Sequence, residues 1–188
     1  MASKKRIELK RRIKEISPPK EIFLKNKSKV KFCQFNFGIK IKNNLEAHYL
    51  QIISEEMHHA VENFLQGNGV YKVGNDLFKS YSKRLYLNFS FYSQLKKIEK
   101  DFGLIIDDLR HLKIEFDLGT TENIINNLMR IQESELAESE DYLWQVLEWN
   151  NYLEPDKEIK ILKKLTHKKI ADWWNNKSKN MDIHKVII

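Results

Sequence analysis

Residues 33–41 read Cys-Gln-Phe-Asn-Phe-Gly-Ile-Lys-Ile. Apolar and polar side chains alternate along this run, and an alternation of period two is typical of a β-strand with one buried face. A second alternating run lies within residues 84–91, where Leu85, Leu87, Phe89 and Phe91 occupy every other position. The two runs predict neighbouring strands of a sheet that buries one side.

Helical patterns surround these strands. Residues 44–66 carry apolar side chains on one side of a helix, and Gly67-Asn68-Gly69 would end that helix. Thr166 is expected to be an N-cap, because its hydroxyl can accept a hydrogen bond from a free backbone N–H of the first turn. Further helices are expected over residues 95–109, 124–131, 136–147, 159–162 and 166–173.

Shorter strands are expected at Val70–Val73 and Val186–Ile188. Gly74-Asn75-Asp76 has the composition of a turn, so the first of these strands should end there. The resulting order is strand, helix, strand pair, several helices. This order predicts an α+β fold, a single domain in which helices pack on one face of an antiparallel sheet.

Composition limits the class of protein. A chain of 188 residues is long enough for one domain with a proper core. The single cysteine, Cys33, excludes an internal disulfide framework and favours an intracellular, cytoplasmic location. Its place in an alternating strand predicts a small buried apolar filler. The sequence shows neither a long apolar run nor a secretory signal, so we expect no membrane partner.

Positive charge is concentrated at the amino end. Residues 1–31 hold twelve Lys/Arg against three Glu, a net charge of +9, whereas the remaining 157 residues carry 21 basic and 23 acidic groups. We therefore expect a basic extension over residues 1–29 and a domain over residues 30–188. The candidate nucleic-acid-binding residues are Lys4, Lys5, Arg6, Lys10, Arg11 and Arg12. Such clusters bind phosphates, but they also serve as targeting signals or as solubilising tails.

One group of residues resembles a zinc site. His58, His59 and Glu62 lie within one helical turn, and His59 to Asn63 differs from the zinc motif H-x-x-E-H in its last residue. Two His at i and i+4 hold zinc in that motif, while the Glu activates water. Asn63 is a poor ligand, and Glu138 or Glu140 would be only distant carboxylates. A solvated helix end is the competing interpretation, and we expect no catalytic, cofactor-binding or metal-binding residue.

The four tryptophans are expected to serve mainly as core. Trp144, Trp149, Trp173 and Trp174 fall on predicted amphipathic helices, although stacking on a peptide or a base is an alternative. Trp173 and Trp174 are adjacent, so both cannot face the core of one helix. One of the pair is therefore a candidate contact residue.

The chain also resembles the closing domain of insulysin/nardilysin-type zinc peptidases, members of the pitrilysin/insulinase superfamily of inverzincins. Residues 37–41 are similar to the opening strand of that domain, and residues 49–55 (Tyr-Leu-Gln-Ile-Ile-Ser-Glu) are similar to its first helix. The last third matches at dispersed positions: Ile124, Leu128, Glu135, Leu136, Glu138, Trp144, Val146, Tyr152, Glu158, Ile159, Leu162, Lys163, Thr166 and Trp173.

The resemblance implies an α+β domain, one of four that form two bowl-like halves around a peptide chamber. It also implies that the zinc-binding helix of the first domain corresponds here to residues 47–52. His48 remains, but Gln51 and Ile52 replace the Glu and the second His of H-x-x-E-H. Relatives lend an Arg and a Tyr from this domain to the reaction centre. Glu62 stands at the Arg position, and Tyr71 is nearest to the Tyr position.

The leading hypothesis is a non-catalytic insulinase-type domain that interacts with a protein partner or complements a separate peptidase half. The alternative is an adaptor that binds nucleic acid or the ribosome through residues 1–29. A zinc peptidase using His58, His59 and Glu62 is a third hypothesis.

Overall fold

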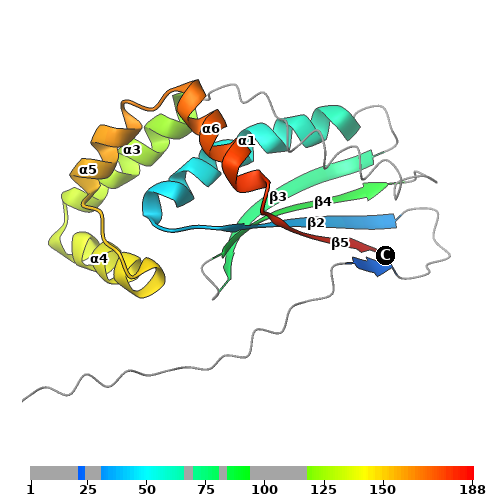
Figure 1. The fold of residues 1–188 in the computed structure, drawn as a ribbon, viewed down its shortest axis with the longest axis horizontal. Coiled ribbons are helices and arrows are strands. Elements are labelled where there is room, and N and C mark those ends of the chain that lie inside the picture. Colours follow the sequence, from blue (N-terminus) through cyan, green and yellow to red (C-terminus); the bar gives the residue numbers. More distant parts are fainter. Residues whose placement is uncertain (1–20, 24–30, 66–69, 81–83, 94–117) are drawn as a thin grey trace, which may run out of the picture.

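The structure is a computed structural model that describes residues 21–23, 31–65, 70–80, 84–93 and 118–188. Along these residues the chain forms two strands, a helix, two strands, four helices and a final strand (Figure 1). The predicted helix at 95–109 and the six basic candidates, Lys4, Lys5, Arg6, Lys10, Arg11 and Arg12, lie outside the described residues.

One five-stranded sheet forms the base of the domain. Its strand order is β1-β5-β2-β4-β3, and neighbouring strands are antiparallel except for the parallel pair β1 and β5. The strands are β1 (Glu21–Phe23), β2 (Lys31–Lys40), β3 (Val70–Ser80), β4 (Arg84–Ser93) and β5 (Asp182–Ile187).

The two alternating runs lie side by side in the centre of this sheet. Strands β2 and β4 pair in a register that sets Cys33 opposite Phe91 and Phe35 opposite Phe89. These side chains are fully buried or nearly so, and the rings of Phe35 and Phe91 lie 5.2 Å apart. Because side chains alternate across a strand, this register gathers the apolar residues of both strands on one face. Cys33 is a buried free thiol, as predicted.

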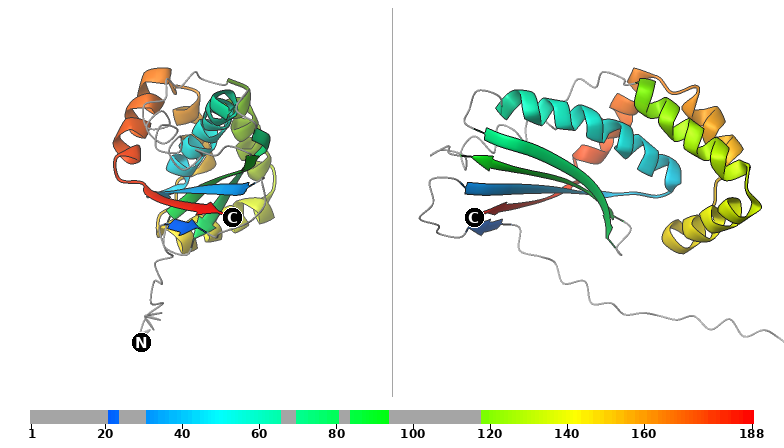
Figure 2. Two further views of the ribbon diagram at one scale, coloured as in Figure 1. Left: turned by 90° about the vertical axis from the view of Figure 1, so that its right-hand side faces the viewer. Right: turned by 180° about the vertical axis from the view of Figure 1, so that it is seen from behind.

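Helix α1 (Asn44–Leu65) runs along the sheet and buries Leu50, Ile52, Ile53 and Met57 completely. The others are α3 (Leu118–Gln132), α4 (Glu135–Trp149), α5 (Pro155–Leu162) and α6 (His167–Ser178). Helix α1 covers that apolar face, α6 contacts β2, and α3, α4 and α5 lie beyond one end of the sheet (Figures 1 and 2). The α+β fold, with helices packed on one face of the sheet, is therefore confirmed.

The predicted turn at Gly74-Asn75-Asp76 is wrong. Strand β3 continues through these residues to Ser80, and its pairing with β4 shifts register between Tyr71 and Gly74. A β-bulge absorbs extra residues in one strand without ending it. Residues with turn chemistry are therefore accommodated inside the strand.

Both ends of the chain contribute to the same edge of the sheet. Strand β1 lies within the expected extension of residues 1–29 and pairs with β5, with Glu21 opposite Lys185. The predicted strand at Val186–Ile188 is longer than expected, because β5 begins at Asp182. The predicted cap of the last helix is confirmed, since the Thr166 hydroxyl accepts a hydrogen bond from the backbone N–H of Lys169 at 3.4 Å.

Candidate docking surface on helix α4

Helix α1 holds His48, Gln51 and Ile52, the three positions that the resemblance aligns with the zinc motif. The His48 side chain is 16% exposed, Gln51 is exposed to solvent, and Ile52 is fully buried. The position of the second His is therefore part of the core, where Ile52 packs among other apolar side chains.

His48 belongs to a buried polar network. The carboxylate of Glu158, on α5, is completely buried, and its Oε2 atom accepts a hydrogen bond from Asn44 Nδ2 at 3.2 Å. His48 Nε2 lies 3.5 Å from the same oxygen and 3.2 Å from Asn44 Nδ2. This network connects the first turns of α1 to α5, and it is the environment in which His48 now lies.

The other candidate zinc residues lie further along α1. The rings of His58 and His59 are 5.9 Å apart, with His58 half-buried, and the Glu62 side chain is exposed. The candidates Glu138 and Glu140 are on α4 and are exposed. Within the described ranges, three or more His, Cys, Asp or Glu side chains are nowhere grouped so that they could hold a metal ion.

Helix α4 presents apolar side chains to solvent. Leu136 is 70% exposed, Leu143 56% and Leu147 82%. At about 100° per residue, positions 136, 143 and 147 lie within roughly 40° of one another around the helix axis. They therefore form a straight stripe, beside which Trp144 is also exposed. The sequence identified the helix and its apolar residues, but not that these residues point away from the core.

The same helix is strongly acidic. Its fifteen residues include Glu135, Glu138, Glu140, Asp141 and Glu148 and contain no Lys or Arg. Burial is the main cause that raises the pKa of Asp141, while a hydrogen bond from Gln145 opposes the rise and the Glu158 charge adds to it. Burial, followed by the charges of Glu138 and Asp141, raises the pKa of Tyr152. Burial is thus the main cause of both shifts, and neighbouring carboxylates add to them.

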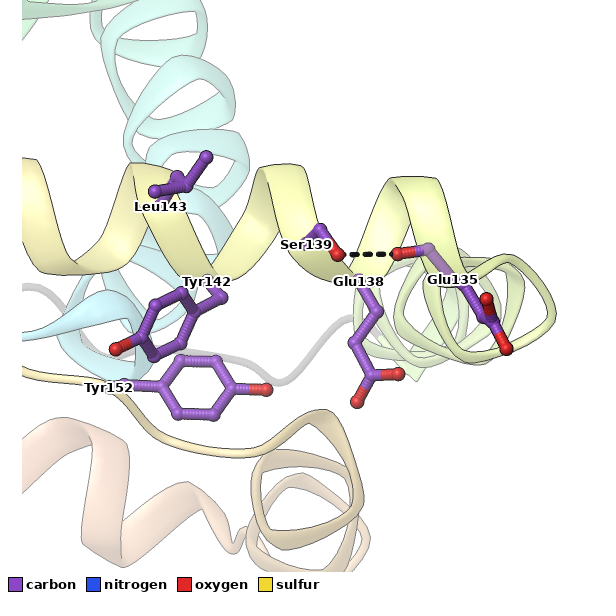
Figure 3. A pocket seen from close by; sticks show the side chains of 6 residues that line it. All are labelled: Glu135, Glu138, Ser139, Tyr142, Leu143 and Tyr152. Atoms are coloured by element: carbon purple, nitrogen blue, oxygen red, sulfur yellow. Dashed lines mark hydrogen bonds between the residues drawn. The ribbon is translucent and has the colours of Figure 1, made fainter.

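A pocket of about 460 Å³ opens beside the stripe (Figure 3). The rings of Tyr142 and Tyr152 meet edge to face in it, with centroids 4.9 Å apart. Figure 3 shows the Glu138 carboxylate on the same side of α4 as these rings. The complete lining is Glu135, Glu138, Ser139, Tyr142, Leu143 and Tyr152. An acidic, aromatic pocket of this kind suits a cationic side chain.

Gln145 fixes the position of Tyr152. Its amide is 1% exposed and donates hydrogen bonds to Asp141 Oδ2 at 2.7 Å and to the Leu153 carbonyl at 3.3 Å. Its Oε1 atom accepts the Leu153 N–H at 3.0 Å. The loop after α4 is therefore tied to the helix, which holds Tyr152 at the pocket. Sequence reasoning missed Gln145, and the only signal available was a polar residue on an otherwise apolar helix side.

The tryptophans divide between core and surface. Trp149 and Trp174 are buried, which confirms the expected core role for these two. Trp173 is half-buried, packs against the edge of the core and meets the Tyr49 ring edge to face at 5.6 Å. Trp144 is 41% exposed and packs against the Trp149 ring at 6.2 Å.

The arrangement of one mostly antiparallel sheet with packed helices is similar to solved peptidase structures, among them pitrilysin and a putative M16-like peptidase. The periplasmic protease PqqL from Escherichia coli is similar over 87% of this chain, with a TM-score of 0.62 and 13% sequence identity. A chain of complex III2 from Candida albicans is similar over 89%, with a TM-score of 0.57 and 12% identity. A putative M16-like peptidase from Alicyclobacillus acidocaldarius is similar over 88%, with a TM-score of 0.52 and 10% identity.

This chain is much shorter than those proteins. The similar region covers 19% of PqqL, 45% of the complex III2 chain and 42% of the Alicyclobacillus protein. No family model matches the sequence, and no curated protein does. At these identities the similarity establishes the fold. Among the described helices, none has the length and apolar character needed to cross a membrane.

Proposed function

We propose that this chain is a non-catalytic insulinase-type domain that binds a protein partner through α4. The observation that carries the proposal is the exposed stripe of Leu136, Leu143 and Leu147 beside an acidic pocket. Exposed apolar residues in a contiguous group are typical of protein interaction sites. Burial of each of these side chains against a partner lowers the free energy of the complex, because apolar surface is removed from water.

The residues at the three positions aligned with the zinc motif, His48, Gln51 and Ile52, support the non-catalytic part of the proposal. Ile52 cannot bind a metal and is part of the core, while Gln51 cannot accept a proton from water as a carboxylate does. His48 interacts with the buried Glu158 instead of standing beside a second His. A charge of the opposite sign, Glu62, stands where active relatives would have an Arg.

We further propose that the domain corresponds to the closing, fourth domain of insulysin/nardilysin-type enzymes and that its partner carries another peptidase-type domain. Two findings favour such a partner. The chain covers only 19% to 45% of the similar proteins, and one of these is a chain of the complex III2 assembly. The buried free thiol of Cys33 favours an intracellular, cytoplasmic partner.

The experiment is a capture of the tagged full-length chain from its own cells, with nuclease present. A photo-crosslinking amino acid replaces Leu147, which is 82% exposed, and in a matched control it replaces Ile161, an exposed apolar residue of α5. We expect a specific crosslinked protein from position 147 and none of it from position 161. Mass spectrometry then identifies the partner, and a chain with an intact H-x-x-E-H motif would support complementation.

Three results would contradict the proposal. Equal crosslinking from both positions would show that α4 is not the docking surface. Recovery of ribosomal or nucleic-acid-bound proteins that disappear with nuclease would favour the adaptor that binds through residues 1–29. One equivalent of zinc in the purified chain, together with chelator-sensitive peptide hydrolysis, would favour the zinc peptidase hypothesis.

A further inference from the structure

We propose that residues 1–16 of this chain occupy the α4 face and regulate access to it. The inference rests on the proposed function, because it assigns a regulator to the same docking surface. The chain therefore carries its own competitor for the partner. Three observations support it: opposite charge, apolar residues at helical spacing in both segments, and a pocket that suits a cation.

The charges of the two segments are complementary. Helix α4 holds five acidic residues and no basic one. Residues 1–16 hold seven Lys/Arg against two Glu, a net charge of +5. The remainder of the chain from residue 32 onward is close to neutral, so this segment is the strongest source of positive charge available to α4. Opposite charges of this kind favour encounter and fix orientation.

Both segments also carry apolar residues at helical spacing. Leu9, Ile13 and Ile16 are spaced i, i+4 and i+7, which in a helix places them on one face. On α4, Leu136 and Leu147 are eleven positions apart, which is about 16 Å along the helix axis at 1.5 Å per residue. An amphipathic helix laid along an exposed apolar stripe is a common mode of peptide recognition.

The pocket supplies a place for one of the basic side chains. The Glu135 and Glu138 carboxylates and the Tyr142 and Tyr152 rings line it (Figure 3). A Lys or Arg head in this pocket would be attracted by both the carboxylates and the faces of the rings. Gln145 holds the loop that carries Tyr152, so this site is already formed before anything binds.

The test is paramagnetic broadening in the full-length chain. A nitroxide is attached at Ala2→Cys, and the buried Cys33 remains unlabelled. We expect the amide signals of α4 to lose several-fold more intensity than those of β2 and β4. The broadening should disappear at 1 M salt, where the Debye length is only about 3 Å.

Matched variants give the test its specificity. Glu135→Gln with Glu138→Gln and Glu140→Gln should remove the α4 broadening. The control neutralises three exposed acidic residues elsewhere, with Glu55→Gln, Glu62→Gln and Asp172→Asn, and should leave the broadening intact. Uniform broadening over the whole domain, or broadening that survives the α4 substitutions, would overturn the inference. Tight binding of an oligonucleotide by the segment, with α4 unbroadened, would also overturn it.

The two proposals fail in different ways. If α4 is never broadened but the crosslinked partner still depends on position 147, the regulatory inference is wrong and the docking function stands. If α4 is broadened and position 147 captures no partner, the docking function is wrong, and α4 serves only to hold residues 1–16.

Discussion

Glu158 is a completely buried carboxylate that joins α5 to the first turns of α1. Its Oε2 atom serves Asn44 and His48, whereas its buried Oε1 atom has no hydrogen-bond partner among the described residues. Removing the side chain would leave Asn44 and His48 without their acceptor and would open a cavity. Glutamine at this position has nearly the same shape, so Glu158→Gln would keep one acceptor oxygen and would remove the buried charge.

We therefore expect Glu158→Ala to lower the free energy of unfolding by about 2–4 kcal/mol. Glu158→Gln should cost much less, because the cost of burying a charge disappears together with the charge. Urea denaturation followed by circular dichroism measures both changes. Glu140→Ala, at an exposed site, is the control and should stay within roughly 0.5 kcal/mol of the parent. Equal losses for the Ala and Gln variants would show that the charge itself is required.

Asp141 provides a test of pH dependence. Burial raises its pKa in the folded protein above the unfolded value, so the ionised form is less favourable in the folded state. This cost is absent below the unfolded pKa of about 3.9 and grows as pH rises through the folded pKa. We expect Asp141→Asn to stabilise the protein at pH 7 and to make no difference below roughly pH 4.

The gain from Asp141→Asn should be small, because a half-exposed charge is screened by water; a value of roughly 0.3–0.5 kcal/mol is reasonable. The hydrogen bond from Gln145 can persist, since asparagine keeps an acceptor oxygen. Thermal unfolding between pH 3 and pH 8 measures the difference. A gain that is the same at every pH would show that the ionisation of Asp141 is not its cause.

At the scale of the elements, the Tyr86 ring of β4 lies close against Gly38 of β2. A Cβ atom added there would lie 2.7 Å from Cε1 of Tyr86, the residue directly opposite on β4. The Tyr86 ring therefore lies across the backbone of β2, a position that only glycine leaves open. We expect Gly38→Ala to cost about 1 kcal/mol, because the ring must move.

A double-mutant cycle isolates this contact. In a Tyr86→Ala background the ring is absent, so Gly38→Ala should cost much less than in the parent. The free energies of unfolding of the four proteins give the coupling energy. If the two costs are simply additive, the close approach of Gly38 and Tyr86 does not limit the pairing of these strands.

The elements also show what the sequence could and could not predict. The strands at residues 33–41 and 84–91 were predictable, because period-two alternation is a local pattern and their register brings both apolar faces together. Strand β1 was not, since it is three residues long and its partner β5 lies at the other end of the chain. The same reason hid the buried hydrogen bond between Asn44 and Glu158, which are 114 positions apart in the sequence. For α4, periodicity located an apolar side but gave no information on what covers it.

At the scale of the whole molecule, the basic segment (residues 1–16) should compete with a partner for the surface of the acidic helix α4. A surface that is free only part of the time binds its partner with an apparent dissociation constant equal to the intrinsic one divided by the free fraction. Weakening the segment should therefore strengthen binding of the partner. A nucleic-acid anchor predicts the opposite, because basic residues would then contribute to binding.

We expect Lys10→Glu with Arg11→Glu and Arg12→Glu to tighten binding of the captured partner by roughly 3- to 10-fold. The control makes the same change in net charge at exposed residues, with Lys163→Glu, Lys164→Glu and Lys168→Glu, and should leave the affinity near that of the parent. Titration at low and high salt measures both, and the gain should shrink at high salt as the charges are screened. Weaker binding by the first variant would mean that the segment helps to hold the partner, and an equal gain in the control would mean that net charge alone is responsible.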